Sequence, residues 1–323
     1  MLTIETALGP IDAAKLGATL SHEHVLVGMG EDIAHYPWRY DMTATRLQSI
    51  KELSEAKAGG IDSLIDLTTP DLGRDVEFIR DVSAASGVNV IVATGIWRDV
   101  PRSFWMRDID EIADIFVREI EVGIGETTIK AGCIKVASDM GGVTPEAERI
   151  LRGAARACRR TGCPISTHQW APEEVGRRQV EVFLEEGAPM DRIAIGHSAD
   201  STDADYLEEL LRTGVYLSMD RYRSSRPPQL EQRNTTLKVL IDRGWAQSSC
   251  SVTTTPPPRS SGARNVHQPQ ARLGTSSAPP SRPRRWSPRA SPEEPSTSCS
   301  AMSPGTSSRA RPGRSALAWR CEI

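Results

Sequence analysis

The sequence predicts an α/β fold, a (β/α)8 TIM barrel whose eighth strand–helix unit is lost. Residues 1–247 alternate short β-rich apolar runs with helical patterns, which is typical of parallel strands joined by helical crossovers. The apolar runs are nearly continuous, as expected for strands that are buried on both faces. Seven such units favour a closed barrel over an open sheet. An eighth should begin just after residue 246, where the composition changes abruptly.

Seven strands are predicted, each a short apolar run rich in β-branched residues. In order they are 18–26, 61–67, 88–96, 131–137, 164–168, 192–197 and 215–219. Amphipathic helices are predicted at 44–58, 109–122, 144–160, 172–186, 203–212 and 230–243. The start at Thr144 is the clearest, because a good N-cap residue is followed by proline at the first helical position.

Composition divides the chain into two predicted parts, residues 1–247 and residues 248–323. The second part holds 17 Ser, 12 Pro and 11 Arg but only three acidic residues, a net charge of +8. Since the whole chain has a net charge of −3, the first part carries −11. That is an ordinary acidic domain, without the basic surface of a nucleic-acid-binding protein.

Targeting and cysteine patterns bound the class of protein further. The chain does not open with a basic segment and an apolar core, and no apolar run is long enough to cross a bilayer. Its six cysteines are scattered without CxxC spacing, which argues against a disulfide framework or a zinc ribbon. These features predict a cytoplasmic enzyme without a membrane partner.

Unusual polar residues fall at the carboxyl ends of four predicted strands, where barrel enzymes place their active sites. They are His22 and His24 on the first strand, Lys135 on the fourth, His168 on the fifth and His197 on the sixth. Alternate residues of a strand share a face, so His22 and His24 make half a metal site. Taken alone, the pair could equally be a polar patch.

Lys135 interrupts the apolar run 133–137, where an ammonium group is costly to bury without a partner. A protonated lysine cannot bind a metal, whereas a neutral one can add carbon dioxide to give a carbamate that bridges two cations. The alternative is a lysine whose ammonium group reaches water at the barrel rim. The residue by itself leaves both interpretations open.

Six stretches together resemble the phosphotriesterase family of the amidohydrolase superfamily, including its lactonase branch. They stand in the family's order through nearly all of residues 1–247: 21–25 (SHEHV), 93–97 (ATGIW), 134–137 (IKVA), 166–168 (STH), 195–200 (IGHSAD) and 217–222 (LSMDRY). Each piece is weak, and their combination in this order is specific.

The resemblance implies a hydrolase with two divalent metals, zinc or else cobalt, manganese or iron. His22 and His24 would bind the more buried metal and His168 and His197 the more exposed one, with carbamylated Lys135, an N6-carboxylysine formed with carbon dioxide, between them. A hydroxide held by the metals would then attack a lactone carbonyl, as in an N-acyl-homoserine lactone, or more weakly an organophosphate triester. Many relatives are dimers, so a homodimer is also open.

Four further residues receive roles from the resemblance. Asp200 would relay the departing proton, although it could instead be the N-cap of the helix that follows. Trp97 would form a wall of the substrate pocket, or only pack at the barrel rim. Arg221 and Tyr222, after the seventh strand, resemble the lactonase branch, since the triesterase branch tends to carry histidine at the arginine position.

The chain departs from the family after residue 247. The family has a Gly-His-Asp motif at the end of strand eight, whose aspartate binds the buried metal, and residues 248–323 contain no aspartate. A shifted reading of the codons for 250–256 permits Leu-Gly-His-Asp-Tyr-Ala-Pro. We therefore interpret this segment as a frameshift, which would impair folding, metal binding and activity; the rival is an authentic disordered tail.

A second function of another class is an inert barrel whose +8 tail binds nucleic acid through counterion release. Against it, the tail has only Trp286 and Trp319 as aromatic residues and no RGG-type repeat.

Overall fold

The computed structural model describes residues 3–222 and 227–250. The chain opens with an antiparallel hairpin, β1 (Thr3–Thr6) and β2 (Gly9–Asp12), which the sequence did not predict. Eight parallel strands follow in sequential spatial order. They are β3 (Thr19–Glu23), β4 (Ser63–Asp66), β5 (Asn89–Ile96), β6 (Cys133–Ala137), β7 (Ile165–His168), β8 (Ile193–Ile195), β9 (Tyr216–Ser218) and β10 (Ser249–Cys250).

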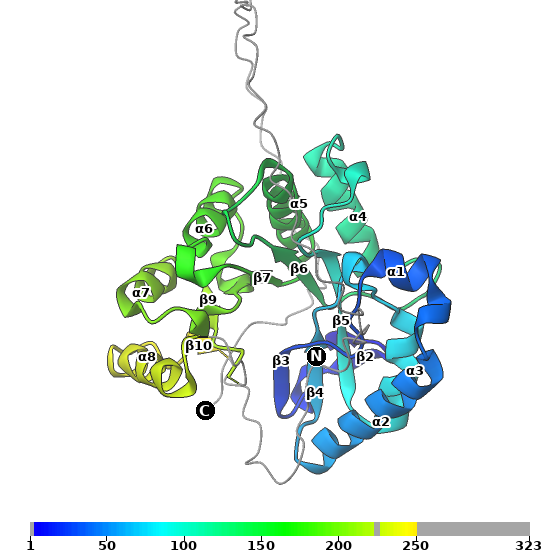
Figure 1. The fold of residues 1–323 in the computed structure, drawn as a ribbon. Coiled ribbons are helices and arrows are strands. Elements are labelled where there is room, and N and C mark those ends of the chain that lie inside the picture. Colours follow the sequence, from blue (N-terminus) through cyan, green and yellow to red (C-terminus); the bar gives the residue numbers. More distant parts are fainter. Residues whose placement is uncertain (1–2, 223–226, 251–323) are drawn as a thin grey trace, which may run out of the picture. The chain divides into compact units, whose positions relative to one another are not determined.

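The helices of this part of the chain lie outside the strands (Figure 1). They are α1 (Gly30–His35), α2 (Met42–Ala58), α3 (Val76–Ser86), α4 (Ile109–Glu121), α5 (Pro145–Thr161), α6 (Gly176–Glu185), α7 (Ala204–Arg212) and α8 (Leu230–Asp242). None of these described helices is both long and apolar enough to cross a membrane. The predicted α/β barrel class is confirmed, and every predicted strand and helix has a counterpart.

Two helices and several boundaries differ from prediction; the strand predicted over 18–26, for example, ends at Glu23. Neither α1 nor α3 was predicted. The helix predicted over 172–186 starts later, at Gly176, because the chain first makes a 3-10 turn at Ala171–Glu173 and then passes through a left-handed residue, Glu174 (φ 53°). At α5 the prediction is confirmed, since the Thr144 hydroxyl accepts a hydrogen bond from the Ala147 N–H.

The barrel is nearly closed. Among the residues that the structure describes, two occupy the eighth position, where Ser249 pairs with Leu217 and Cys250 with Ser218. Within the described residues, β3 pairs with β4 alone and β10 with β9 alone, so the seam between them is unpaired. An eighth strand therefore begins where it was predicted. The rest of the predicted tail, with its proposed nucleic-acid-binding role, lies outside the described residues.

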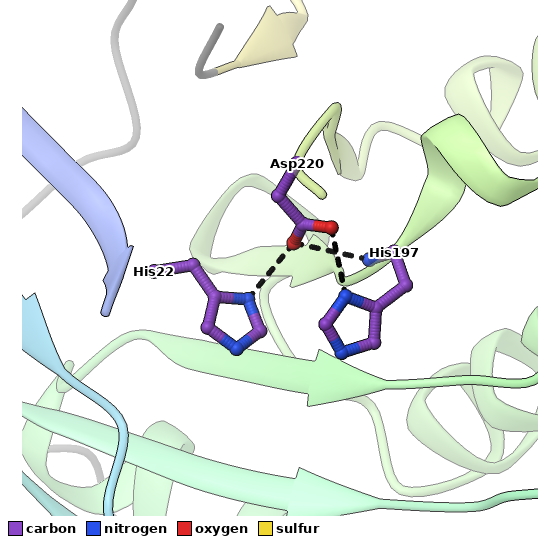
Figure 2. A group of neighbouring side chains, drawn as sticks. All are labelled: His22, His197 and Asp220. Carbon is purple, nitrogen blue, oxygen red and sulfur yellow. Dashed lines mark hydrogen bonds and ion pairs between the residues drawn. The ribbon is translucent and has the colours of Figure 1, made fainter. Parts of the chain in front are cut away.

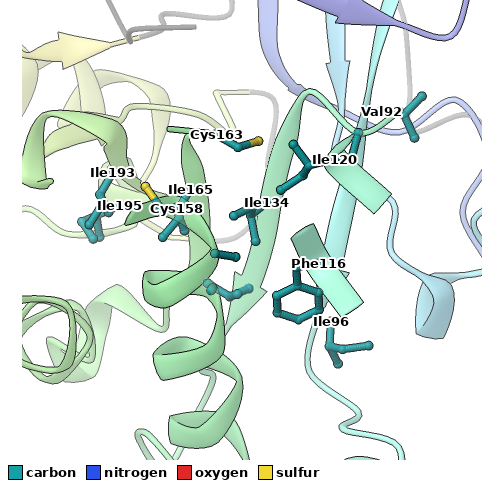
Figure 3. Packing of buried hydrophobic residues seen from close by; sticks show 14 of the residues in the cluster. Val92, Ile96, Phe116, Ile120, Ile134, Cys158, Cys163, Ile165, Ile193 and Ile195 are labelled. Carbon is teal, nitrogen blue, oxygen red and sulfur yellow. The ribbon is translucent and has the colours of Figure 1, made fainter. Parts of the chain in front are cut away.

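The core lies between the outer helices and the strands. Figure 3 shows one part of it, where α4 and α5 face the middle strands. Phe116 of α4, Ile134 of β6 and Cys158 of α5 are all buried there. Buried aliphatic side chains of this kind each contribute about 1.5–3 kcal/mol to folding, so this layer fixes β5 to β8 and, with them, the carboxyl ends that carry the polar residues.

Two features shape the strand ends. Gly95 (φ 110°) pairs with Lys135, and a Cβ there would lie 2.0 Å from the Lys135 carbonyl oxygen, so only glycine fits. On the other side, β3 carries one extra residue between Leu20 and Glu23 relative to β4. Such a bulge bends the strand and re-aims its side chains, and here it lies at His22.

Candidate metal centre

The four predicted histidines lie together at the carboxyl ends of β3, β7 and β8. The rings of His22 and His197 stack with centroids 4.7 Å apart, and His168 meets His197 edge-on at 4.6 Å. His24 lies 5.8 Å from His22. Lys135 of β6 is buried beside them, with only 1% of its surface exposed. Strand pairing thus assembles the predicted residues, while their roles as ligands remain predictions.

Asp220, just after β9, connects two of these histidines (Figure 2). Its carboxylate oxygens lie 2.8 Å from Nδ1 of His22 and 2.7 Å from Nδ1 of His197. The Ser218 hydroxyl and the His197 backbone N–H also donate to it. Burial by itself would raise the pKa of Asp220, but the contacts with His197 and His22 hold it well below its usual range. The carboxylate is therefore an anion that only accepts hydrogen bonds.

These contacts fix the tautomers of His22 and His197. Burial lowers the pKa of His22 to about 4 and that of His197 well below its ordinary value, so both rings are neutral near pH 7. Since Asp220 can only accept, each Nδ1 must carry the ring proton. Each Nε2 is then an unprotonated donor atom for a metal. In Figure 2 both Nε2 atoms point away from Asp220.

A hydroxyl group holds the His24 ring. The Thr68 hydroxyl lies 2.9 Å from His24 Nδ1 and 3.2 Å from the Leu26 carbonyl oxygen. When the hydroxyl donates to this carbonyl, Thr68 accepts the hydrogen bond from Nδ1–H and Nε2 of His24 carries no proton. Metal-binding histidines commonly have their other ring nitrogen held by a carboxylate, carbonyl or similar group.

His168 is held differently. Its Nε2 is buried without a hydrogen-bond partner among the described residues and lies 3.5 Å from the Asp139 carboxylate, which also pairs with Arg98 at 2.9 Å. Contact with His168 and Arg98 holds the pKa of Asp139 below its usual range. The indole of Trp97 meets the His168 ring edge-on at 5.4 Å. Trp97 therefore lies beside the cluster, as its predicted wall role requires.

Lys135 is held by a carbonyl rather than by a carboxylate. Its Nζ donates to the Thr167 carbonyl at 3.0 Å, and burial lowers its pKa to about 7. Much of the amine is then uncharged at neutral pH, which is the form that reacts with carbon dioxide. Gly196 keeps this space open, because a Cβ there would lie 1.9 Å from the same carbonyl oxygen. The surface-lysine alternative does not fit this burial.

The donor set fits divalent cations in two ways. One ring nitrogen of His22, one of His197 and a carboxylate oxygen of Asp220 lie within 4.8 Å of one another and could hold one ion. Binding through Nδ1 would require both ring protons to leave, whereas the Nε2 atoms of His22 and His197 are already unprotonated and need no such change. Imidazole and carboxylate ligands suit zinc and related metals. We therefore favour binding through Nε2.

Asp200, Arg221 and Tyr222 lie in the loops that follow β8 and β9. Asp200 pairs with Arg221 at 2.7 Å and with Arg233 of α8 at 2.6 Å. It is not the cap of α7, because Asp203 accepts the cap hydrogen bonds. The hydroxyl of Tyr222 is buried without a hydrogen-bond partner in the described part of the chain. Their predicted catalytic and substrate-binding roles remain predictions.

Three supporting residues were missed at the sequence level: Asp220, Thr68 and Asp139. Each lies just beyond the end of a strand, and a carboxylate directly after the apolar run 215–219 was a usable signal for Asp220. Thr68 and Asp139 follow strands in the same way, but threonine and aspartate are so common in such loops that their identity carries little information.

The neutral histidines predict how the stability of the metal-free chain depends on pH. Burial lowers the pKa of both His22 and His168 to about 4, whereas an unfolded histidine titrates near 6.5. Between these values the unfolded state binds more protons, so stability falls as pH decreases from about 6.5 towards 4, by about 1.4 kcal/mol per pH unit for each group. Thermal unfolding across this range measures it.

The control for this prediction is an exposed histidine. His168→Asn should reduce the slope of the unfolding free energy against pH by the contribution of one proton. His35 is exposed on α1, so His35→Asn should leave this slope unchanged. Equal slopes for the parent chain and the His168→Asn variant would contradict a neutral buried His168.

Comparison with known proteins shows which family the chain belongs to. The profile of the Phosphotriesterase family matches residues 2–252. A phosphotriesterase homology protein of Mycobacterium tuberculosis is 44% identical over 256 residues, which cover 76% of this chain and 78% of that protein. An aryldialkylphosphatase of Saccharolobus solfataricus is 35% identical over 238 residues, covering 73% of this chain and 76% of that protein.

A solved structure agrees with these relatives. The phosphotriesterase from Mycobacterium tuberculosis superposes with a TM-score of 0.72 at 42% sequence identity, covering 76% of this chain and 79% of that one. More distantly, N-acetyltaurine hydrolase of Xenopus tropicalis is 24% identical over 283 residues, covering 75% of this chain and 81% of that protein. The chain therefore belongs to the phosphotriesterase family.

Proposed function

We propose that this chain is a two-metal hydrolase of the lactonase branch, opening lactones such as N-acyl-homoserine lactones and hydrolysing organophosphate triesters as a weaker side activity. The observation that carries the proposal is the convergence of four neutral histidines and a buried lysine at one end of the barrel, with Asp220 orienting two of the rings. Arg221 after β9, where the triesterase branch tends to carry histidine, favours lactones.

The residues would divide between two cations as the family resemblance implies. His22 and His24 would hold one, His168 and His197 the other, and Lys135 would lie between them as a carbamate. When bound, the cations would lower the pKa of water and polarise the carbonyl or phosphoryl oxygen of the substrate. Opening a lactone adds one water across its acyl C–O bond and yields a hydroxy acid.

The chain's own side chains orient these groups and the substrate. Asp220 keeps the Nε2 atoms of His22 and His197 unprotonated and aimed away from it, and Thr68 holds the ring of His24. Trp97 contributes an apolar wall beside His168. The guanidinium group of Arg221 can donate hydrogen bonds to negative charge that develops on the substrate oxygen.

The test uses the purified full chain loaded with zinc and bicarbonate. We expect zinc-dependent opening of an N-acyl-homoserine lactone that exceeds hydrolysis of diethyl p-nitrophenyl phosphate, and loss of both activities with a chelator. Lys135→Met should lose the bicarbonate dependence of zinc retention, which metal analysis reads without turnover. Faster hydrolysis of the triester would remove the chain from the lactonase branch, and absence of any zinc-dependent hydrolysis would overturn the proposed function.

A further inference from the structure

The loop that follows β8 is joined to α8 through a network of three charged side chains, those of Asp200, Arg221 and Arg233. Asp200 ends the 3-10 turn Ser198–Asp200, three residues after His197, the cluster histidine that follows β8. One of its carboxylate oxygens accepts from Nη1 of Arg221 at 2.7 Å, and the other accepts from Nη1 of Arg233 at 2.6 Å. One carboxylate thus serves two guanidinium groups, one from the loop after β9 and one from the first turn of α8.

Arg233 is an unusual member of this network because it is fully buried, with 0% of its surface exposed. Its Nε donates to the Pro228 carbonyl at 2.9 Å, while its Nη2 has no hydrogen-bond partner among the described residues. A buried guanidinium group is tolerated only when it is paired. Asp200 is its one carboxylate partner in the described part of the chain.

Arg221 is the most exposed member of the same network and stands next to Asp220 in the sequence. Its side chain is 29% exposed, and its backbone is left-handed at φ 61°, a conformation that costs energy for any residue with a Cβ. Arg221 directly follows Asp220, whose carboxylate contacts Nδ1 of His22 at 2.8 Å and Nδ1 of His197 at 2.7 Å. The backbone of residue 221 is therefore attached to the residue that joins the two rings.

We propose that Arg233 is a positioning residue: from α8 it holds Asp200, and Asp200 in turn holds the Arg221 guanidinium against the metal centre. This rests on the proposed function for the substrate that Arg221 would contact, namely the carbonyl oxygen of a lactone. It assigns α8, which carries no residue of the histidine cluster, a part in the site. Since both carboxylate oxygens of Asp200 accept from guanidinium groups, Asp200 serves here to orient a cation.

The first measurement reads the position of Arg221 without any turnover. Cyclohexane-1,2-dione modifies accessible arginines, and peptide mass spectrometry follows the peptide that contains residue 221. In Arg233→Met we expect faster modification of Arg221 than in the parent chain, and Arg233→Lys should restore part of the protection. Circular dichroism and thermal unfolding confirm that each variant folds. Unchanged or slower modification of Arg221 in a folded Arg233→Met chain would overturn the proposal.

The second measurement is a double-mutant cycle on ligand affinity, with a γ-lactam analogue of the lactone as a probe that resists hydrolysis. We expect Arg233→Met to weaken binding about tenfold, and to have almost no effect once Arg221→Met is present. Arg243→Met is the matched control, because Arg243 follows α8 and pairs with Asp205 and Glu208 away from the centre. Additive losses would contradict a role exerted through Arg221.

The proposed function and the positioning role of Arg233 can be refuted independently of each other. If the parent chain neither binds the lactam nor opens lactones, the proposed function is wrong, and modification of Arg221 still decides the role of Arg233. If lactones are opened but Arg221 is modified equally in the parent and the Arg233→Met chains, only the positioning role is wrong.

Discussion

A chain translated in the shifted frame from codon 248 onward is expected to open lactones about 10²–10⁴-fold faster than the present chain. That factor is the rate that an enzyme typically loses when a positioned acid or base is removed. The codons for residues 250–256 permit a Gly-His-Asp motif in the shifted frame. In this family such an aspartate is a metal ligand and proton acceptor. The measurements are kcat/KM on one lactone and zinc content per chain, on purified proteins of verified mass.

The restored chain should also be more stable, because the seam of the barrel would be filled. In the described residues β3 and β10 each have an unpaired side, and only Ser249 and Cys250 occupy the eighth position. Unpaired strand edges favour aggregation, which closure of a barrel prevents. The control is the restored chain with its new aspartate changed to asparagine, which should keep the gain in thermal stability and lose most of the gain in rate.

Two outcomes would contradict the frameshift interpretation. One is a present chain that turns over lactones as fast as the restored chain. The other is a gene in which the bases around codon 247 show no insertion or deletion, with the same Ser/Pro/Arg-rich ending in sister strains. Either would favour an authentic tail, and the site would then have to work with the carboxylates that the described residues contain.

The strands were predictable because each is an apolar run of limited length between loop residues. Lys135 stood out in such a run, and its burial decides against the rim alternative that the sequence left open. Helix α3 also carried readable end signals, since Asp75 caps its start and Gly87 is left-handed at its end. Its omission was therefore a failure to use local information that the sequence contained.

The contacts around the histidines could not be predicted in the same way. Asp220 and His22 are 198 positions apart, and their 2.8 Å contact exists only because the ends of β3 and β9 face one another across the barrel. The pairing of Asp200 with Arg233 likewise depends on how α8 packs. Local patterns report which residues lie at strand ends, whereas the partner of each side chain is decided by tertiary geometry.

Asp220→Asn is expected to weaken zinc binding about 10–100-fold, the usual cost of losing a partner that orients a metal ligand. Asparagine keeps the shape of the side chain but presents one acceptor oxygen and one N–H donor group. Only one of the two Nδ1–H groups would keep its acceptor. The other ring, of His22 or His197, must rotate or move its proton to Nε2, and either change removes a metal-binding atom. Competition with a chromophoric chelator measures the affinity.

Ser218→Ala is the matched control, because it removes one hydrogen bond to Asp220 at 2.9 Å and leaves both histidine contacts in place. It should change zinc affinity far less than Asp220→Asn does. Unaltered affinity in the asparagine variant would show that the two rings are held by other means. X-ray absorption at the zinc edge separates the remaining arrangements. If Asp220 orients rings that bind through Nε2, the variant loses nitrogen ligands; if Asp220 itself binds the ion beside Nδ1, it loses an oxygen ligand instead.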